Sequence, residues 1–139
     1  MGSKSDFLEA ELLDHVLGNA AYSAPATVHV ALFSVTPSDA GGGTEATGTG
    51  YARVAKTNNA TNWPAATGTN PTTKANGTVV DFGTAGGLWS AGANMVAFGI
   101  FDDPTAGNLL LWGALTVPKP VYEGDPVTFP IGALTWTED

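Results

Sequence analysis

Cysteine is absent from this chain of 139 residues, and charged side chains are scarce. Without cysteine the fold has no disulfide, and no thiolate metal site can form. Charged residues make up 13% of the sequence, against a usual share of about 25%. Ladders and turns must therefore cover much of the polar backbone. The low charge also favours a protein that covers part of its surface against neighbours in an assembly.

Basic side chains are few and scattered. Five Lys and Arg stand against thirteen Asp and Glu, which gives a net charge of −8. Nucleic-acid binding depends on clusters of cations that displace counterions from phosphates, and no cluster occurs here. We therefore expect no nucleic-acid partner. The acidity indicates a source of solubility, or alternatively attraction to a basic patch on a partner.

Long apolar runs are also missing. The most apolar stretch, from Asn108 to Val117, is too short to span a bilayer, which takes roughly 20 residues. The segment from Met1 to Asp14 has neither the basic start nor the apolar run of a signal peptide. We expect a soluble protein with no membrane contact that is not exported by the usual route.

One amphipathic helix is expected at residues 5–17. Ser5 or Asp6 can cap it, and Asp6 with Glu9 imitates a capping box. Gly18 and Asn19 provide a suitable stop. Six apolar residues recur at helical spacing and form a broad stripe: Phe7, Leu8, Leu12, Leu13, Val16 and Leu17. The stripe packs either on this chain's own sheet or on a neighbouring subunit.

The periodicity becomes strand-like after Pro25, over a β region at 27–137. Residues 27–35 are apolar on both faces, which is typical of a central strand, and we expect the helix to cover one face. Further strands are expected at 51–56, 78–82, 94–101, 109–117, 127–129 and 131–137. Short strands separated by turns are typical of sandwiches and barrels. The sequence predicts a mainly β, single-domain antiparallel β-sandwich or small barrel, spanning 1–139, with one N-terminal α-helix.

Two long polar segments, 37–50 and 57–77, are expected to be loops. Loops of this length usually carry function or contacts. Trp63 stands alone among Asn, Thr and Ala in the second segment. It either anchors that loop in the core or contacts a partner.

Motifs for catalysis or metal binding are not found. The sequence has no nucleophile elbow, phosphate loop or zincin motif, and His15 and His29 have no obvious third ligand. Asp102, Asp103 and Asp125 lie in turns, where aspartate usually bonds its own backbone. We expect no enzyme, no catalytic residue, no cofactor and no metal.

Aromatic side chains offer one other kind of site. Trp89, Trp112, Trp136 and Tyr122 could stack on sugars, as in a carbohydrate-binding β-sandwich. Trp112 and Trp136 fall within expected strands, where the core or a subunit interface explains them. Trp89 follows Gly86 and Gly87 and is the most loop-like of the four.

An ordered set of short motifs runs along nearly the whole chain. They are 12–18 (LLDHVLG), 28–33 (VHVALF), 48–54 (GTGYARV), 99–102 (GIFD), 108–115 (NLLLWGAL), 124–125 (GD) and 130–134 (PIGAL). In this order they resemble a family of small tailed-bacteriophage virion proteins, described either as head decoration (cement) proteins or as tail-fibre-like proteins. The chain departs from that pattern by a longer Thr- and Asn-rich segment at 57–77.

The resemblance implies a structural role in the virion and no catalytic residues. We expect a capsid decoration protein, made in the host cytoplasm, that binds the outside of the head as a homotrimer and has the major capsid protein as its partner. The alternative is a tail, baseplate or tail-fibre component with other tail proteins as partners. The candidate interface residues are Phe7, Leu8, Leu12, Val16, Trp63 and Trp89.

Overall fold

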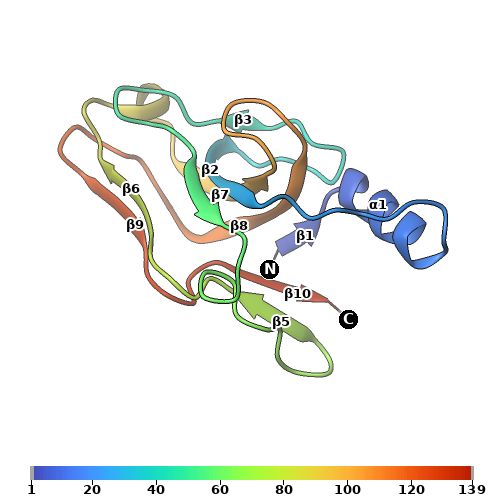
Figure 1. Cartoon of the computed structure of the whole chain (residues 1–139). Coiled ribbons are helices and arrows are strands. Elements are labelled where there is room, and N and C mark those ends of the chain that lie inside the picture. The colour runs from blue at the N-terminus through green and yellow to red at the C-terminus, as the bar shows by residue number, and fades with distance from the viewer. Residues whose placement is uncertain (1, 139) are drawn as a thin grey trace.

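The computed structural model describes residues 2–138. Within that range the chain forms one α-helix, one short turn with left-handed backbone (η1) and short strands (Figure 1). In chain order they are β1 (Gly2–Lys4), α1 (Asp6–Val16), β2 (Thr27–Val35), β3 (Thr44–Glu45), β4 (Val54–Thr57), β5 (Thr72–Ala75), β6 (Val80–Thr84), η1 (Trp89–Gly92), β7 (Met95–Phe101), β8 (Leu109–Lys119), β9 (Pro126–Phe129) and β10 (Thr135–Glu138).

A six-stranded sheet forms the centre of the molecule, in the order β1-β8-β7-β2-β3, with β4 also paired to β2. Two smaller ladders, β6–β9 and β5–β10, are separate from it. Every strand pair is antiparallel. The mainly β, antiparallel prediction with one helix is confirmed. The main sheet is open among the described residues, so its strands form a sandwich-like arrangement and not a closed barrel.

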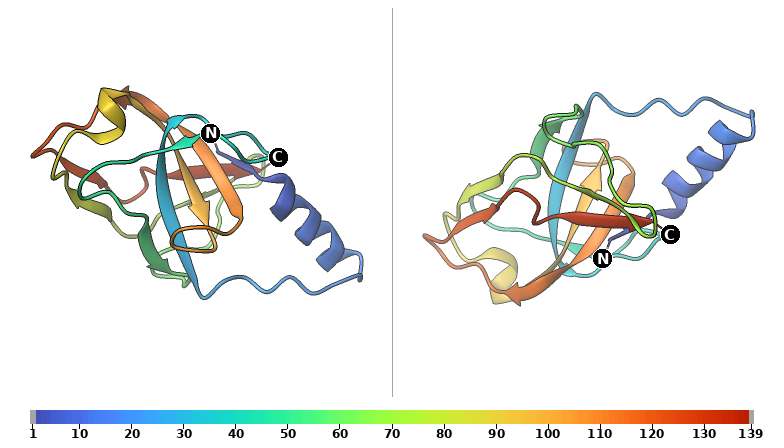
Figure 2. Two further views of the ribbon diagram at one scale, coloured as in Figure 1. Left: turned by 90° about the horizontal axis from the view of Figure 1, so that it is seen from above. Right: turned by 90° about the horizontal axis from the view of Figure 1, so that it is seen from below.

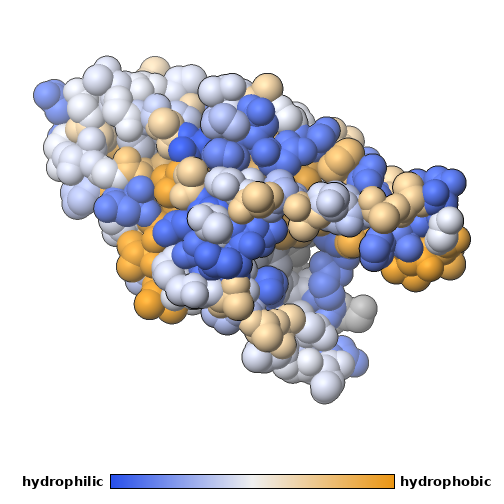
Figure 3. Space-filling model, viewed as in Figure 1, coloured by the Kyte–Doolittle hydropathy of each residue, from blue (hydrophilic) through white to orange (hydrophobic). Residues whose placement is uncertain are grey.

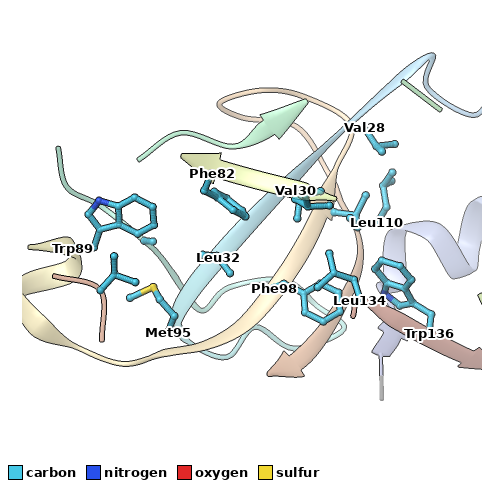
Figure 4. Packing of buried hydrophobic residues seen from close by; sticks show 14 of the residues in the cluster. Val28, Val30, Leu32, Phe82, Trp89, Met95, Phe98, Leu110, Leu134 and Trp136 are labelled. Carbon is cyan, nitrogen blue, oxygen red and sulfur yellow. The ribbon is translucent and has the colours of Figure 1, made fainter. Parts of the chain in front are cut away.

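The core lies between the main sheet and the two smaller ladders (Figure 4). Alternate residues of β2 face it, including Val30 and Leu32, which are almost completely buried. Leu134 and Trp136 enter the core from the loop before β10 and from β10 itself. This alternation is what the apolar pattern of 27–35 predicts.

The opposite face of β2 carries a smaller cluster around Ala31, Phe33 and Ala97. Phe101 stacks on Phe33 with ring centroids 6.2 Å apart, and the Arg53 guanidinium carbon lies 3.6 Å from the centroid of the Phe101 ring. The expectation that the helix covers a face of β2 is therefore wrong. Helix α1 instead projects sideways from β1 and β8 (Figure 2).

Both long segments that were expected to be loops contain a strand. Residues 37–50 include β3, and residues 57–77 include β5. Four predicted strands begin later than expected: β4 at Val54, β6 at Val80, β7 at Met95 and β10 at Thr135. Strand β1, which was not predicted, pairs with the middle of β8 and forms one edge of the main sheet.

Candidate interaction surface

The first turn of α1 fastens the helix to the sheet. Ser5 is the N-cap, and its hydroxyl oxygen accepts a hydrogen bond from the Leu8 backbone N–H at 3.2 Å. The same hydroxyl donates to the carbonyl of Leu109, and the Ser5 N–H donates to the carbonyl of Leu110 at 2.9 Å. Leu8 is buried, and Phe7 and Leu12 pack against the core cluster. The first half of the apolar stripe therefore packs on this chain's own fold.

The second half of the stripe is left uncovered by residues 2–138. Leu13, Val16 and Leu17 are 62%, 74% and 80% exposed, and they form what we call the helix tip. Figure 3 shows apolar surface at this free end of the helix. Large apolar side chains grouped on a projecting element are typical of a protein–protein contact.

The chain that leaves the tip is held in a fixed path. The Leu17 N–H donates to the Leu13 carbonyl, and the Asn19 N–H to the Asp14 carbonyl, both at 2.9 Å. Further along, the Tyr22 N–H donates to Nδ1 of His15 at 3.1 Å. These bonds end the helix and direct the chain back along it towards β2. The end of the helix and the segment that follows it are therefore bonded to each other.

An apolar groove of about 660 Å³ lies between β8 and β9, and we call it the β8–β9 groove. Its floor includes the core residues Met95 and Phe98. Among its walls are Leu115, Val117, Pro120, Val127 and Phe129. Val117 is 70% exposed. The groove arises from a shift in the pairing of β7 with β8. Ala97 pairs with Ala114, but Met95, two residues before Ala97, pairs with Lys119, five residues after Ala114. The extra residues of β8 bulge away from β7.

The helix and the groove differ in charge. Helix α1 contains four acidic residues, Asp6, Glu9, Glu11 and Asp14, and neither Lys nor Arg. Lys119 and Asp125 are the charged residues that line the groove, and one carboxylate oxygen of Asp125 accepts a bond from the Tyr122 N–H at 2.9 Å.

Lys119 differs from the other basic residues of the chain. Lys4 and Arg53 form ion pairs with Glu138 and Glu45. Lys56 and Lys74 donate to backbone carbonyls. Over residues 2–138, the ammonium group of Lys119 has no such partner.

The six candidate interface residues fall into three groups by exposure. Val16 is at the tip, while Phe7 and Leu12 are half-buried near the base of the helix. Leu8 and Trp63 are each only 9% exposed, and Trp89 is fully buried. These three therefore offer little or no surface to a neighbour. Leu13, Leu17 and the groove residues were not among the candidates, although Leu13 and Leu17 lie in the predicted stripe.

Trp89 is buried because a glycine lies against it. A Cβ on Gly48 would lie 2.7 Å from Cδ1 of the Trp89 ring, and Gly48 has a φ of 138°. The indole N–H donates to the Thr49 carbonyl at 3.0 Å. Trp136 is also buried, with its ring centroid 5.9 Å from that of Trp63. Trp89 and Trp136, two of the four rings considered for sugar stacking, are therefore not available to stack on sugars.

Many polar side chains of the chain bond to its own backbone or to one another. The Tyr51 hydroxyl donates to Glu45 at 2.8 Å and accepts from the Leu32 N–H at 3.1 Å, and burial raises the pKa of this phenol. The backbone N–H groups of Thr105 and Ala106 donate to Asp103 and lower its carboxyl pKa. Asp103 thus bonds its own turn, as its position in the sequence predicts.

Comparison with known proteins gives one family. The family model described as podophage GP4 fiber I protein gp80 matches residues 3–137. No curated protein matches the chain. Over residues 2–138 there is no helix with the length and apolarity needed to cross a membrane. The resemblance to small tailed-phage virion proteins is confirmed. The chain therefore belongs to the podophage GP4 fiber I protein gp80 family and is a structural protein of a phage virion.

Proposed function

We propose that this protein is a building block of a phage fibre and acts through noncovalent contacts made by its projecting helix. The observation that carries the proposal is the helix tip, where Leu13, Val16 and Leu17 stand exposed at the end of a helix whose base is fixed in the sheet. Covering these three apolar side chains with a partner is favourable, because it removes their surface from water.

The description of the family supports a fibre over a capsid decoration protein. The matched family is described as a fibre protein, whereas the expected binding to the capsid exterior through the major capsid protein has no support of its own. A homotrimer likewise remains a prediction. The partners that we propose are other fibre or tail proteins and further copies of this chain.

The fold suits a mechanical role in two ways. The body of the molecule has its own apolar core and does not need a partner to cover it. The contact surface stands outside that body on a helix whose first turn is bonded to the sheet, so a partner meets a surface that is already folded. Preorganisation of this kind increases affinity because less conformational entropy is lost on association.

The proposal is tested by locating and counting the protein in the virion. Quantitative mass spectrometry would give its copy number relative to the major capsid protein, and gold-labelled antibody would show its position on the particle by electron microscopy. A fibre component would be present in far fewer copies than the major capsid protein, and the antibody label would lie beside the tail. A ratio near one with label over the whole head would refute the fibre proposal and establish decoration.

A further inference from the structure

We propose that the helix tip of one copy docks in the β8–β9 groove of a second copy. The inference rests on the proposed function and names the partner that covers the helix tip, which is a second copy of this chain. The tip and the groove are the two halves of one contact, and each copy carries both.

The two surfaces are complementary in shape and in kind. The tip is convex and consists of two Leu and one Val, all more than 60% exposed. The groove is concave, with about 660 Å³ of space, and it is lined mostly by aliphatic, proline and phenylalanine side chains. A helix end laid in an apolar groove is a recurrent way for proteins to recognise each other. Docking removes both apolar surfaces from water.

Charge supports a second copy as the occupant. The helix brings four carboxylates without a Lys or Arg. Of the two charged residues of the groove, Asp125 accepts a hydrogen bond from the Tyr122 N–H, whereas the ammonium group of Lys119 has no partner within residues 2–138. Glu9 and Asp14 are exposed next to the apolar side chains of the tip. When the tip enters the groove, these carboxylates and Lys119 attract each other and favour one orientation of the helix.

The positions of the two surfaces determine the type of assembly. Helix α1 projects from one side of the molecule, and β6 and β9 lie at the other side in all three views (Figures 1 and 2). A tip therefore does not reach the groove of its own chain, and the contact joins two different surfaces. Such head-to-tail contacts produce an open chain when the rotation between copies does not close a ring. An open chain is the form that a fibre requires.

The first experiment measures association of the purified full chain by sedimentation velocity over a range of concentrations. We expect the wild type to associate increasingly with concentration. Val16→Asp at the tip and Val117→Asp in the groove should each weaken association by about tenfold or more, because a charge replaces a buried apolar group. Val35→Asp is the matched control. Val35 is 54% exposed at the end of β2 and belongs neither to the helix nor to the residues that line the groove, and its substitution should leave association unchanged.

The second experiment mixes the two defective variants. Val16→Asp retains an intact groove and Val117→Asp retains an intact tip, so the mixture should form a 1:1 complex and nothing larger. Both substituted side chains are at least 70% exposed, so both variants should fold. Circular dichroism and thermal unfolding of each variant verify this, and Leu17→Asp and Lys119→Glu provide second variants of the tip and the groove.

Three results would each overturn the inference. The wild type could remain monomeric up to about 1 mM, a concentration at which even weak contacts appear. The tip variant could lose association while the groove variants keep it, which would show that the tip binds elsewhere. The mixture could fail to form a complex. None of these results bears on the fibre assignment, which depends on the copy number and position of the protein in the virion.

Discussion

Replacing Arg53 by Met should destabilise the fold strongly, because this guanidinium joins three parts of the chain. Its Nε and Nη2 donate to the two carboxylate oxygens of Glu45 at 2.9 and 2.8 Å. Its Nη1 donates to the carbonyls of Asp103 and Ala106 at 2.8 and 2.7 Å. The charge also lies over the Phe101 ring. The Arg53 side chain, just before β4, thus holds β3 and the loop between β7 and β8 together.

The size of the effect follows from these contacts. The Arg53 side chain is only 6% exposed, whereas that of Glu45 is 29% exposed and can be hydrated when its partner is lost. We therefore assign about 1 kcal/mol to the ion pair. Each bond to a loop carbonyl adds about 0.5–1 kcal/mol and the cation–π contact about 0.5–1 kcal/mol. The expected loss is about 3 kcal/mol, or about 10 °C in melting temperature.

Urea denaturation followed by tryptophan fluorescence measures this loss, and differential scanning calorimetry checks it. Lys56→Met is the matched control. Lys56 lies three residues further along the chain, in β4, and its ammonium group donates to Thr78 and Val79, so its substitution should cost less than about 1 kcal/mol. The reasoning is refuted if Arg53→Met costs less than about 1 kcal/mol, or no more than the control.

Three further substitutions test other contacts. Tyr51→Phe should cost about 1–2 kcal/mol in urea denaturation, because the Leu32 N–H loses its acceptor at a half-buried site. Asn76→Ala should cost about 3 kcal/mol or more in calorimetry, because Asn76 is 1% exposed and its amide accepts from the Leu134 N–H and donates to two carbonyls. Asp103→Ala should reduce hydrogen-exchange protection in its turn at neutral pH. The pKa of Asp103 is lowered in the folded chain, so its stabilising effect is present above the ordinary aspartate pKa and is lost as the pH falls through the lowered value.

Each of these expectations has a clear contrary result. A Tyr51→Phe variant as stable as the wild type would show that water replaces the hydroxyl. A loss below about 1 kcal/mol for Asn76→Ala would show that the buried groups find other partners. A difference between Asp103→Ala and the wild type that persists unchanged in acid would exclude the ionised carboxylate as its cause.

Sequence patterns predicted the elements whose side chains alternate strongly. Strand β2 runs over Thr27–Val35, the range that its β-branched and apolar pattern gives. Strand β5 was missed because Thr72–Ala75 is polar, with no large apolar side chain, and it is a strand because it pairs with β10. A strand such as β5 forms because it pairs with a segment far away in the sequence, and this pairing cannot be predicted from the local residue pattern.

The candidate surface was predicted in part for a similar reason. The apolar stripe on the helix was visible at 5–17, but the sequence does not record where the helix points. Only the structure shows that Leu8 packs on the core while Leu17 is 80% exposed. The burial of Trp89 depends on the close approach of Gly48, about forty residues earlier in the chain. Its neighbours Gly86 and Gly87 indicated an exposed loop instead.

The return path of the chain has a mechanical consequence for a protein whose helix is pulled. The start of α1 joins β1 at the edge of the main sheet, and residues 17–26 lead from its end to β2 in the middle of the same sheet. Asn58 holds this returning segment by bonds to the carbonyls of Pro25 and Ala26 at 3.0 and 2.8 Å. A load on the helix tip is thus divided between two anchorages. Tension that detaches the edge strand still leaves the tip tethered to the centre of the fold.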